Sequence, residues 1–427
     1  MKKIPLHEKI IIAMLLGLLW TFVSENLGIL QFNIDWLAPF GDIFMRLLKF
    51  IAVPLVLFSI IKGVSGLSNI SELGRMGLKT VLLYLSTTCI AVFVGLFLVN
   101  QIGPGKNLNI DLNLNKDNLN KISSIQDNYL KSSEDSPLQF LVDMVPENIF
   151  LSLSDNSSML QIIFFSLFFA AMLIMIPSKK KIHIDNLIDS FYEVFLKMVD
   201  IVIKYCPVFI FALLAGTLSK VSKGNEEGIL SIVKGLGLYV LVVVLGLMIM
   251  ALVVYPLFLR LFTKKFSYKK FFKAIAPAQI LAFSTSSSAA TLPVTMDCVR
   301  DNLKIPNKVS GFVLPIGATV NMDGTSLYQC VAVVFLAQML GYELTLMTQL
   351  LVASTAILAS IGSAAVPSAG LFMLVVVLGV AGIDPMWIAL VLPVDRILDM
   401  CRTVVNVTGD ATICSVVNSF QKEDATS

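Results

Sequence analysis

Charged residues are scarce in this chain, and histidine is scarcer still. Of 427 residues, 14% are charged, and the formal net charge is only +3. A charge balance this small provides no basic surface, so we expect no nucleic-acid partner. The two histidines, His7 and His183, flank apolar segments, which argues against a histidine-based catalytic site or a zinc site. We therefore do not expect an enzyme.

Cysteine pairs at disulfide or metal-binding spacing are also missing. The six cysteines lie in or beside apolar runs, where small packing residues are common. Apolar residues, in contrast, are abundant: 56% of the chain is hydrophobic, and the mean hydropathy is +0.83. This composition is typical of an all-α polytopic membrane protein. We therefore expect the chain to lie in the lipid bilayer of a plasma or inner membrane, with its first apolar run kept as a span.

Six apolar segments in the first 260 residues are each long enough to cross the roughly 30 Å hydrocarbon layer of a bilayer. These segments are 7–28, 37–63, 80–102, 157–177, 190–218 and 233–260. Lysine and arginine precede the first segment and follow the second, fourth and sixth. Positive charge marks the cytoplasmic side, so both termini are expected in the cytoplasm. The Asn- and Asp-rich segment 103–137 then becomes a flexible extracellular loop.

Two charge-free stretches in the C-terminal half do not fit a simple crossing. The first lies between Lys273 and Asp297 and contains SSSAATLP between basic flanks, so the hairpin 268–300 is expected to enter from the cytoplasm and turn at Ser286–Ser288. The stretch 345–382 contains SIGSAAVPSAG between acidic flanks, which predicts entry from the outside. Together with spans 305–340 and 385–415, these hairpins form two repeats of opposite orientation, as in secondary transporters. The predicted fold has eight transmembrane helices and two opposed re-entrant hairpins.

The last span carries a polar stripe that an apolar helix does not need. At about 100° per residue, its members fall within an arc of roughly 120°. They are Asp395, Arg396, Asp399, Arg402, Thr403, Asn406 and Asp410. One charge at the bilayer centre costs about 2.5–3.5 kcal/mol, so these charges must face one another, water, ions or a ligand. Two interpretations remain: a solute or ion pathway, and a self-neutralised stripe in which Asp399 pairs with Arg402.

The stripe has the chemistry to bind an acidic amino acid. Asp399 can pair with an ammonium group, and the planar fork of Arg402 suits a side-chain carboxylate. The hairpin tips offer backbone N–H groups and serine hydroxyls to the α-carboxylate. A C4-dicarboxylate would not need Asp399 as an amine partner. A neutral amino acid would leave Arg402 buried without its carboxylate.

A second polar motif, GATVNMDGTSLYQ, occupies 317–329. Its carboxylate, Asp323, lies beside Gly324, which weakens the helix and can free carbonyl groups. Such oxygens suit a dehydrated Na⁺ ion, although a kink with a hydrogen-bonded Asp is the alternative. The third apolar segment, 80–102, carries the hydroxyls of Tyr84, Thr87 and Thr88. From the residues alone, these hydroxyls are expected only to bond to the preceding turn.

The motifs SSSAATLP, NMDGT, SIGSAAVPSAG and DMCRTVVNVTGD together resemble one family over nearly the whole chain. This is the dicarboxylate/amino acid:cation symporter family, which includes archaeal and bacterial glutamate/aspartate symporters and animal excitatory amino acid transporters. The resemblance implies a homotrimer with an elevator mechanism. Segments 1–75 and 138–225 would form the fixed scaffold. Segments 76–102 and 226–420 would form the moving transport domain, with the second hairpin as extracellular gate.

The resemblance also implies roles for individual residues. Asp399 would take the substrate amine and Arg402 its side-chain carboxylate. The substrate pocket would be completed by Ser287, Ser288, Thr325, Ala365, Thr403 and Asn406. One Na⁺ site matches Gly317, Asn321, Asn406 and Asp410. A second, which replaces the structural interpretation of the third span, matches Tyr84, Thr87, Thr88, Asn321 and Asp323. A third matches Thr319, Ser360, Ile361 and Ser363.

The chain departs from its relatives' pattern at an arginine. Archaeal relatives carry it in the first hairpin tip, where this chain has Ser286. Animal relatives carry it directly after the binding Asp, where this chain has Met400. Arg396, three residues before Asp399, is the candidate for this charge partner.

Two further departures concern coupling and gating. Gln329 stands where animal relatives carry a glutamate linked to proton and potassium coupling, which argues against potassium counter-transport and weakens the case for proton coupling. Ala365 and Ser368 replace glycines common in the second hairpin and would stiffen the gate. The sequence therefore predicts a symporter that imports L-aspartate or L-glutamate with Na⁺ as the coupling ion. The alternatives are a proton-coupled symporter and a ligand-gated ion channel.

Overall fold

The structure is a computed structural model that describes residues 6–65, 75–106, 142, 145–154, 158–222, 228–263, 267–361 and 369–424. Throughout these ranges the regular elements are helices, without any strand, which confirms the all-α prediction. Most of the predicted extracellular loop 103–137 lies outside the described residues. The tip of the second hairpin, 362–368, lies outside them as well.

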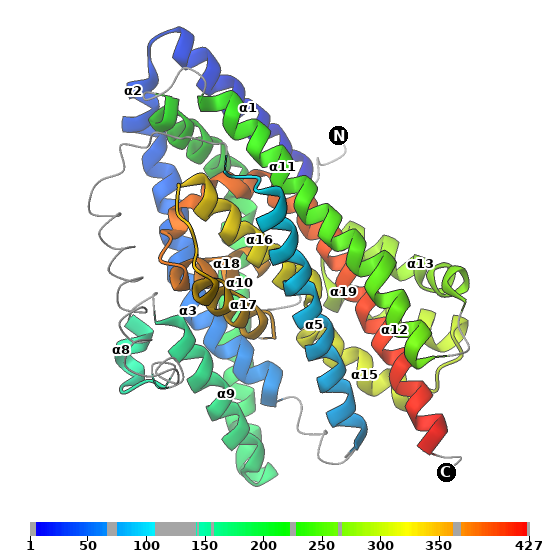
Figure 1. Ribbon diagram of the computed structural model, residues 1–427. Coiled ribbons are helices and arrows are strands. Elements are labelled where there is room, and N and C mark those ends of the chain that lie inside the picture. Colours follow the sequence, from blue (N-terminus) through cyan, green and yellow to red (C-terminus); the bar gives the residue numbers. More distant parts are fainter. Residues whose placement is uncertain are drawn as a thin grey trace, which may run out of the picture.

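The N-terminal helices pack mainly against one another (Figure 1). They are α1 (Leu6–Asn26), α2 (Leu30–Phe32), η1 (Asn33–Leu37), α3 (Ala38–Ser65), α8 (Ile149–Ser154), α9 (Met159–Met175) and α10 (Ser178–Ser222). α10 packs along both α1 and α3, and α9 packs on α3. α10 is longer than the predicted span 190–218, and it bends by 52° near Ile203.

The remaining helices gather around the C-terminal helix α19 (Ile388–Asp424). They are α5 (Arg75–Ile102), α11 (Gly228–Ile249), η3 (Met250–Val254), α12 (Tyr255–Phe262), α13 (Tyr268–Thr285), α14 (Ser288–Asp297), η4 (Cys298–Asn302), α15 (Asn307–Val320), α16 (Asp323–Met339), α17 (Leu346–Ile361), α18 (Ala369–Val380) and η5 (Pro385–Trp387). α19 contacts α5, α11, α12, α13, α15 and α16. Its polar stripe therefore faces other helices. The division into scaffold and transport domain stays a prediction.

Each predicted hairpin corresponds to two helices that pack against each other, α13 with α14 and α17 with α18. In the first, Ser286 ends α13 in the left-handed conformation, with φ of 52°. Ser287 then caps α14, because its Oγ accepts a hydrogen bond from the Ala290 N–H at 3.1 Å. The turn thus lies at the serines where the sequence placed it. That the hairpins re-enter a membrane remains a prediction.

The predicted span 305–340 is interrupted, and the break lies before Gly324, where the sequence indicated a weak point. α15 ends at Val320 and α16 begins at Asp323, so Asn321 and Met322 are outside both helices, while Gly324 is already helical. Asn321 donates its backbone N–H to the Gly317 carbonyl at 2.8 Å and closes α15. Its side chain bonds to α19, which compensates for leaving the helix.

Three helical stretches among the described residues are long and apolar enough to cross a membrane: Leu30–Lys62, Met76–Ile102 and Lys234–Phe262. The bent pair Lys179–Val202 and Lys204–Ser219 adds a fourth if it counts as one span. Large apolar side chains point outward from these helices, such as Phe93 at 69% exposure and Phe97 at 54%. This outward apolar surface suits a lipid environment. The count of eight spans stays a prediction.

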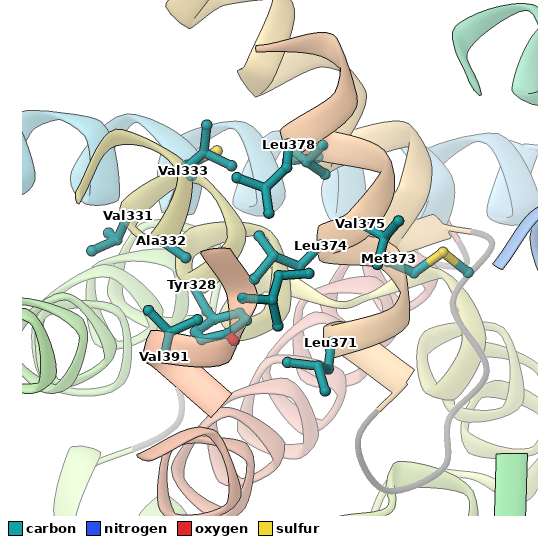
Figure 2. Packing of buried hydrophobic residues seen from close by; sticks show 14 of the residues in the cluster. Tyr328, Val331, Ala332, Val333, Leu371, Met373, Leu374, Val375, Leu378 and Val391 are labelled. Carbon is teal, nitrogen blue, oxygen red and sulfur yellow. The ribbon is translucent and has the colours of Figure 1, made fainter. Parts of the chain in front are cut away.

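The core that positions the site joins α16, α18 and α19 (Figure 2). Val331 and Val333 of α16, Leu374 and Leu378 of α18 and Val391 of α19 belong to one buried cluster. All are buried. Between membrane helices such packing acts through dispersion and close fit, because lipid is as apolar as the side chains. The core holds α16 rigidly beside the charged part of α19.

Candidate functional site

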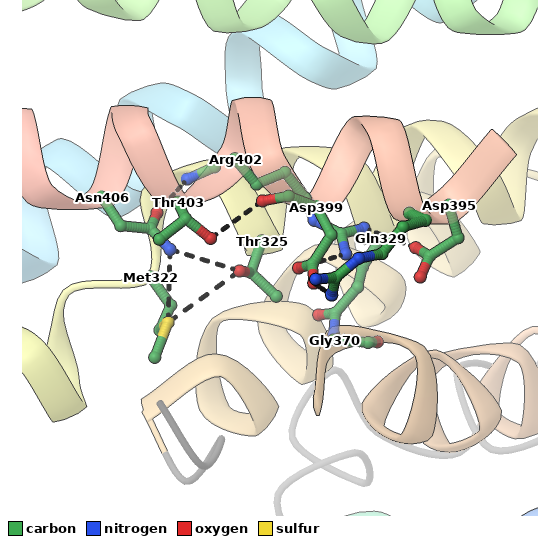
Figure 3. Close-up of polar contacts among 11 residues, drawn as sticks. Met322, Thr325, Gln329, Gly370, Asp395, Asp399, Arg402, Thr403 and Asn406 are labelled. Carbon is green, nitrogen blue, oxygen red and sulfur yellow. Dashed lines mark hydrogen bonds and ion pairs between the residues drawn. The ribbon is translucent and has the colours of Figure 1, made fainter. Parts of the chain in front are cut away.

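Four charged side chains of α19 form a continuous chain of ion pairs (Figure 3). Arg402 Nη1 lies 2.9 Å from Asp395 Oδ1, and Arg402 Nη2 lies 2.8 Å from Asp399 Oδ1. On the other oxygen of Asp399, Arg396 Nη1 lies at 3.7 Å. The four charges cancel. The Asp399–Arg402 pair of the self-neutralised interpretation is thus present, and Asp395 adds a second partner that the sequence did not indicate.

The guanidinium of Arg402 is fully buried and held on a third side by an aromatic ring. Arg402 Cζ lies 3.8 Å from the centre of the Tyr328 ring on α16, a cation–π geometry. Among the described residues, Arg402 Nε has no hydrogen-bond partner. A buried Arg with a spare donor can take a further acceptor.

Thr403 and Asn406 continue the stripe toward the break between α15 and α16. Thr403 donates its hydroxyl to the Asp399 carbonyl at 2.8 Å. Asn406 Oδ1 accepts from the Gly324 N–H at 2.8 Å, and Asn406 Nδ2 lies 3.4 Å from Thr325 Oγ1. Met322 sulfur lies 3.3 Å from the same Nδ2. Asn406 therefore connects the start of α16 to α19, and it brings the predicted pocket residue Thr325 beside the stripe.

At the first hairpin tip, the predicted pocket residue Ser287 forms hydrogen bonds within its own turn. Ser287 and Ser288 are buried at the start of α14, where Thr291 donates to the Ser287 carbonyl at 2.8 Å. Ser286 Oγ, also buried, has no partner among the described residues. α14 contacts α19. Ala365, the pocket residue predicted in the second hairpin, lies outside the described residues.

Asp323 is a fully buried carboxylate at the first turn of α16. Its Oδ1 accepts from Thr88 Oγ1 at 2.6 Å, and its Oδ2 accepts from Tyr255 Oη at 2.8 Å. Thr87 and Thr88 both donate to the Tyr84 carbonyl, at 3.0 and 2.9 Å, as expected from the residues alone. Thr88 in addition reaches Asp323, and the part of both hydroxyls in a Na⁺ site stays a prediction.

Asp410 is a second buried carboxylate, one turn beyond Asn406 on α19. Asn321 Nδ2 donates to Asp410 Oδ1 at 2.8 Å and to the Asn406 carbonyl at 3.1 Å. A Cβ at Gly317 would collide with Asp410 Oδ1 and with Tyr84 Oη. The close approach of these groups therefore requires glycine. The structure brings together all four residues of the first predicted Na⁺ site.

Neither Asp323 nor Asp410 pairs with a basic side chain among the described residues, in contrast to the neutral chain of Arg402. Beside them, Asn321 Oδ1 is buried without a hydrogen-bond partner. Buried carboxylates without counter-charges are costly, and oxygen atoms of this kind are the ligands Na⁺ and Ca²⁺ prefer. The described residues contain no group of three His, Cys, Asp or Glu for a transition metal. The oxygens present fit a hard monovalent cation.

The third predicted Na⁺ site is only partly visible. Thr319 on α15 donates to the Ile316 carbonyl at 3.0 Å, and Ser360 on α17 donates to the Ile357 carbonyl at 2.8 Å. α15 and α17 contact each other. Ile361 ends α17, and Ser363 lies outside the described residues.

Three residues at the site were missed as site residues by the sequence analysis. Tyr255 binds Asp323, Tyr328 covers Arg402, and Asp395 pairs with Arg402. Asp395 was visible as part of the stripe. Tyr255 and Tyr328 are single tyrosines in apolar spans, a signal too weak to separate them from core residues.

Known proteins match this chain along almost its whole length. The model of the sodium:dicarboxylate symporter family matches residues 6–420. Excitatory amino acid transporter 3 of Oryctolagus cuniculus is 32% identical over 97% of this chain and 85% of its own length. For excitatory amino acid transporter 2 of Mus musculus the values are 34%, 90% and 73%, and for an excitatory amino acid transporter of Caenorhabditis elegans 32%, 96% and 87%. The chain therefore belongs to the sodium:dicarboxylate symporter family, a family of membrane transporters, as its motifs predicted.

Proposed function

We propose that this chain is a secondary active symporter that imports L-aspartate or L-glutamate down a Na⁺ gradient. Membership of the sodium:dicarboxylate symporter family supports a sodium-coupled carrier of acidic solutes. The relatives are named as excitatory amino acid transporters, which supports an amino acid as the substrate.

The observation that carries the proposal is the buried pair of Asp399 and Arg402, joined at 2.8 Å. A substrate that separates this pair must supply a new cationic partner for Asp399 and a new acceptor for Arg402. An acidic amino acid does so, because its ammonium group can pair with Asp399 while its side-chain carboxylate takes the Arg402 Nη2 that Asp399 leaves. Asp395 stays on Nη1 and keeps Arg402 in place.

The same exchange predicts that other solutes are poorer substrates. A neutral amino acid would pair with Asp399 but leave Nη2 of Arg402 without an acceptor. A dicarboxylate would satisfy Arg402 but bring no ammonium group for Asp399, whose contact with Arg396 is long, at 3.7 Å. A buried charge that loses its partner costs about 3–5 kcal/mol, which corresponds to at least a hundredfold in affinity.

Na⁺ coupling is supported by two buried carboxylates, Asp323 and Asp410, that have no basic partner among the residues the structure describes. Each can be neutralised by one Na⁺, held by the surrounding oxygens of Thr88, Asn321 and Asn406. The substrate brings one further negative charge. Three cations would therefore neutralise the loaded site, which matches the three sites implied by the family motifs. The site of Thr319, Ser360, Ile361 and Ser363 would hold the third.

The proposal includes an elevator mechanism in a homotrimer embedded in the plasma or inner membrane, with both termini in the cytoplasm. α19 with α5, α11–α16 and the α17–α18 hairpin would move as one transport domain. The N-terminal helices would stay fixed as a scaffold. The second hairpin would open the site to the outside. Its contact with α16 through Gln329 Nε2 and the Gly370 carbonyl, at 3.2 Å, would then rearrange.

Uptake into proteoliposomes tests the proposed function. Purified protein is reconstituted, and radiolabelled L-aspartate is supplied with an inward Na⁺ gradient, with choline in place of Na⁺, or with an inward proton gradient alone. We expect accumulation above the outside concentration only with Na⁺. Accumulation driven by protons without Na⁺ would indicate a proton symporter. Equilibration without accumulation would indicate a channel, since a channel cannot move solute against its gradient.

A further inference from the structure

Tyr255 lies against the proposed cation site but belongs to none of the four motifs SSSAATLP, NMDGT, SIGSAAVPSAG and DMCRTVVNVTGD. It is the first residue of α12 and directly follows the π-helical turn η3. Such a turn inserts an extra residue and changes the face that the following residues present. α12 and η3 both contact α19. Tyr255 is fully buried, and its hydroxyl points into the polar region between α16 and α19.

The Tyr255 hydroxyl is a donor to the Asp323 carboxylate. The Oη–Oδ2 distance is 2.8 Å, and the other oxygen of Asp323 accepts from Thr88 at 2.6 Å. Both oxygens of Asp323 thus have a hydroxyl donor. A carboxylate that accepts such donors is stabilised without a cation, because hydrogen bonds to a charged group are the strong ones.

The position of Tyr255 depends on a small residue of α19. A Cβ at Gly409 would lie 2.8 Å from Tyr255 Oη and 2.7 Å from Asn321 Nδ2. Any larger residue at 409 would push the hydroxyl away from Asp323. Tyr255 and Gly409 therefore form one local arrangement beside Asp323 and Asn321, two of the predicted Na⁺ ligands.

We propose that Tyr255 is a positioning residue that stabilises Asp323 in the cation-free protein and so limits how tightly Na⁺ binds there. This inference rests on the proposed Na⁺ coupling. Na⁺ gains its binding energy by neutralising the carboxylate, and a donor that already shares this charge reduces the gain. Loss of the donor destabilises the cation-free protein more than the cation-bound protein. A symporter must also release Na⁺ on the inner side, and Tyr255 favours release by stabilising the empty carboxylate.

The test is the stabilisation of purified protein by Na⁺, without substrate and without uptake. The thermal unfolding midpoint is measured while Na⁺ replaces choline at constant ionic strength, for the wild type, Tyr255→Phe and Tyr268→Phe. Tyr268→Phe is the matched control, because its hydroxyl also donates one hydrogen bond, to the Leu252 carbonyl at 3.1 Å on the outer surface.

For Tyr255→Phe we expect the half-saturating Na⁺ concentration to fall about three- to tenfold, since one donor to a charged group is lost. Its unfolding midpoint should fall in choline and approach the wild-type value at saturating Na⁺, whereas Tyr268→Phe should titrate like the wild type. Weaker Na⁺ binding in Tyr255→Phe would identify Tyr255 as a ligand and overturn the inference. So would an unchanged titration, or failure to fold even at saturating Na⁺. Absence of any Na⁺ effect on the wild type would overturn the proposed Na⁺ coupling itself.

Discussion

Asp399 and Arg402 lie one helical turn apart on α19, and their side chains are joined at 2.8 Å in a buried place. The pair is not isolated, because Arg402 Nη1 lies 2.9 Å from Asp395 Oδ1. Arg402 is thus fixed by one carboxylate and can exchange the other. Separate groups for fixing and for binding allow a charged side chain to receive substrate without losing its position.

Replacement of Arg402 by cysteine tests its role directly. Arg402→Cys should reduce L-aspartate uptake about a hundredfold or more, because the substrate carboxylate then has no cationic partner. Uptake of neutral amino acids such as serine could then appear, since no buried guanidinium is left unpaired. Uptake of both substrates in proteoliposomes is the measurement. Arg300→Cys is the control, because Arg300 is exposed and its ion-pair partners among the described residues are the nearby Asp297 and Asp301. Unchanged L-aspartate uptake in Arg402→Cys would contradict the assignment.

Arg396 competes weakly with the substrate ammonium for Asp399. The Nη1–Oδ2 distance of 3.7 Å and the partial exposure of Arg396 indicate a pair worth about 0.5–1 kcal/mol. Arg396→Met should therefore lower the KM for L-aspartate about two- to fivefold, and Arg396→Lys should restore the wild-type value. Initial uptake rates over a range of L-aspartate concentrations give the KM of each variant. A raised KM in Arg396→Met would mean instead that Arg396 orients Asp399.

Asp323 and Asp410, which have no basic partner in the described part of the chain, should carry the Na⁺ dependence of uptake. In Asp323→Asn or Asp410→Asn, the half-saturating Na⁺ concentration for uptake should rise at least about tenfold, because the charge that Na⁺ neutralises is gone. The Na⁺-induced rise of the unfolding midpoint should shrink in parallel. Asp297→Asn is the control, since Asp297 is exposed and paired with Arg300. Wild-type Na⁺ dependence in both site variants would argue against these Na⁺ sites.

Two glycines of α15 provide a matched pair of substitutions. Gly317→Ala places a Cβ against Asp410 and Tyr84, so it should abolish Na⁺-dependent uptake and lower the unfolding midpoint. Gly311→Ala meets only the Asn307 side chain, at 3.7 Å, and should be neutral or stabilise the helix by up to about 1 kcal/mol. Thermal unfolding and uptake are measured for both. Equal effects of the two substitutions would show that helix propensity, rather than the close approach at Gly317, is what matters.

The residue at position 329 should determine whether uptake depends on a proton bound to a side chain of α16. Its Nε2 donates to the Gly370 carbonyl at 3.2 Å, so a glutamate there can replace it as a donor only when protonated. Gln329→Glu should therefore make uptake fall as the pH rises, while the wild type stays level between about pH 5.5 and 8. Gln338→Glu is the control, because Gln338 also donates to a backbone carbonyl, that of Val99 at 3.2 Å, but is only partly buried. A level pH profile in Gln329→Glu would contradict the prediction.

The sequence by itself determined the helical class, the family and most of the polar residues at the site. Mean hydropathy predicted the membrane class, and the period of 3.6 residues gathered Asp395 to Asp410 on one face of a helix. The basic flanks of the first hairpin predicted that it turns at Ser286–Ser288, and the structure has its turn there, with Ser287 as the cap of the next helix. The motifs then identified a family that the whole-length match confirmed.

Only the tertiary structure decided which of these polar groups meet. That Arg402 pairs with Asp395 as well as Asp399, under the ring of Tyr328, depends on rotamers and on the packing of α16 against α19. That Tyr255 reaches Asp323 depends on the π-helical turn η3 and on the absence of a side chain at Gly409. Residues so distant in the chain share no periodicity, so no pattern along the sequence can place them together. The physical reason is that helix propensity is local, whereas the charges of a buried site are balanced across helices.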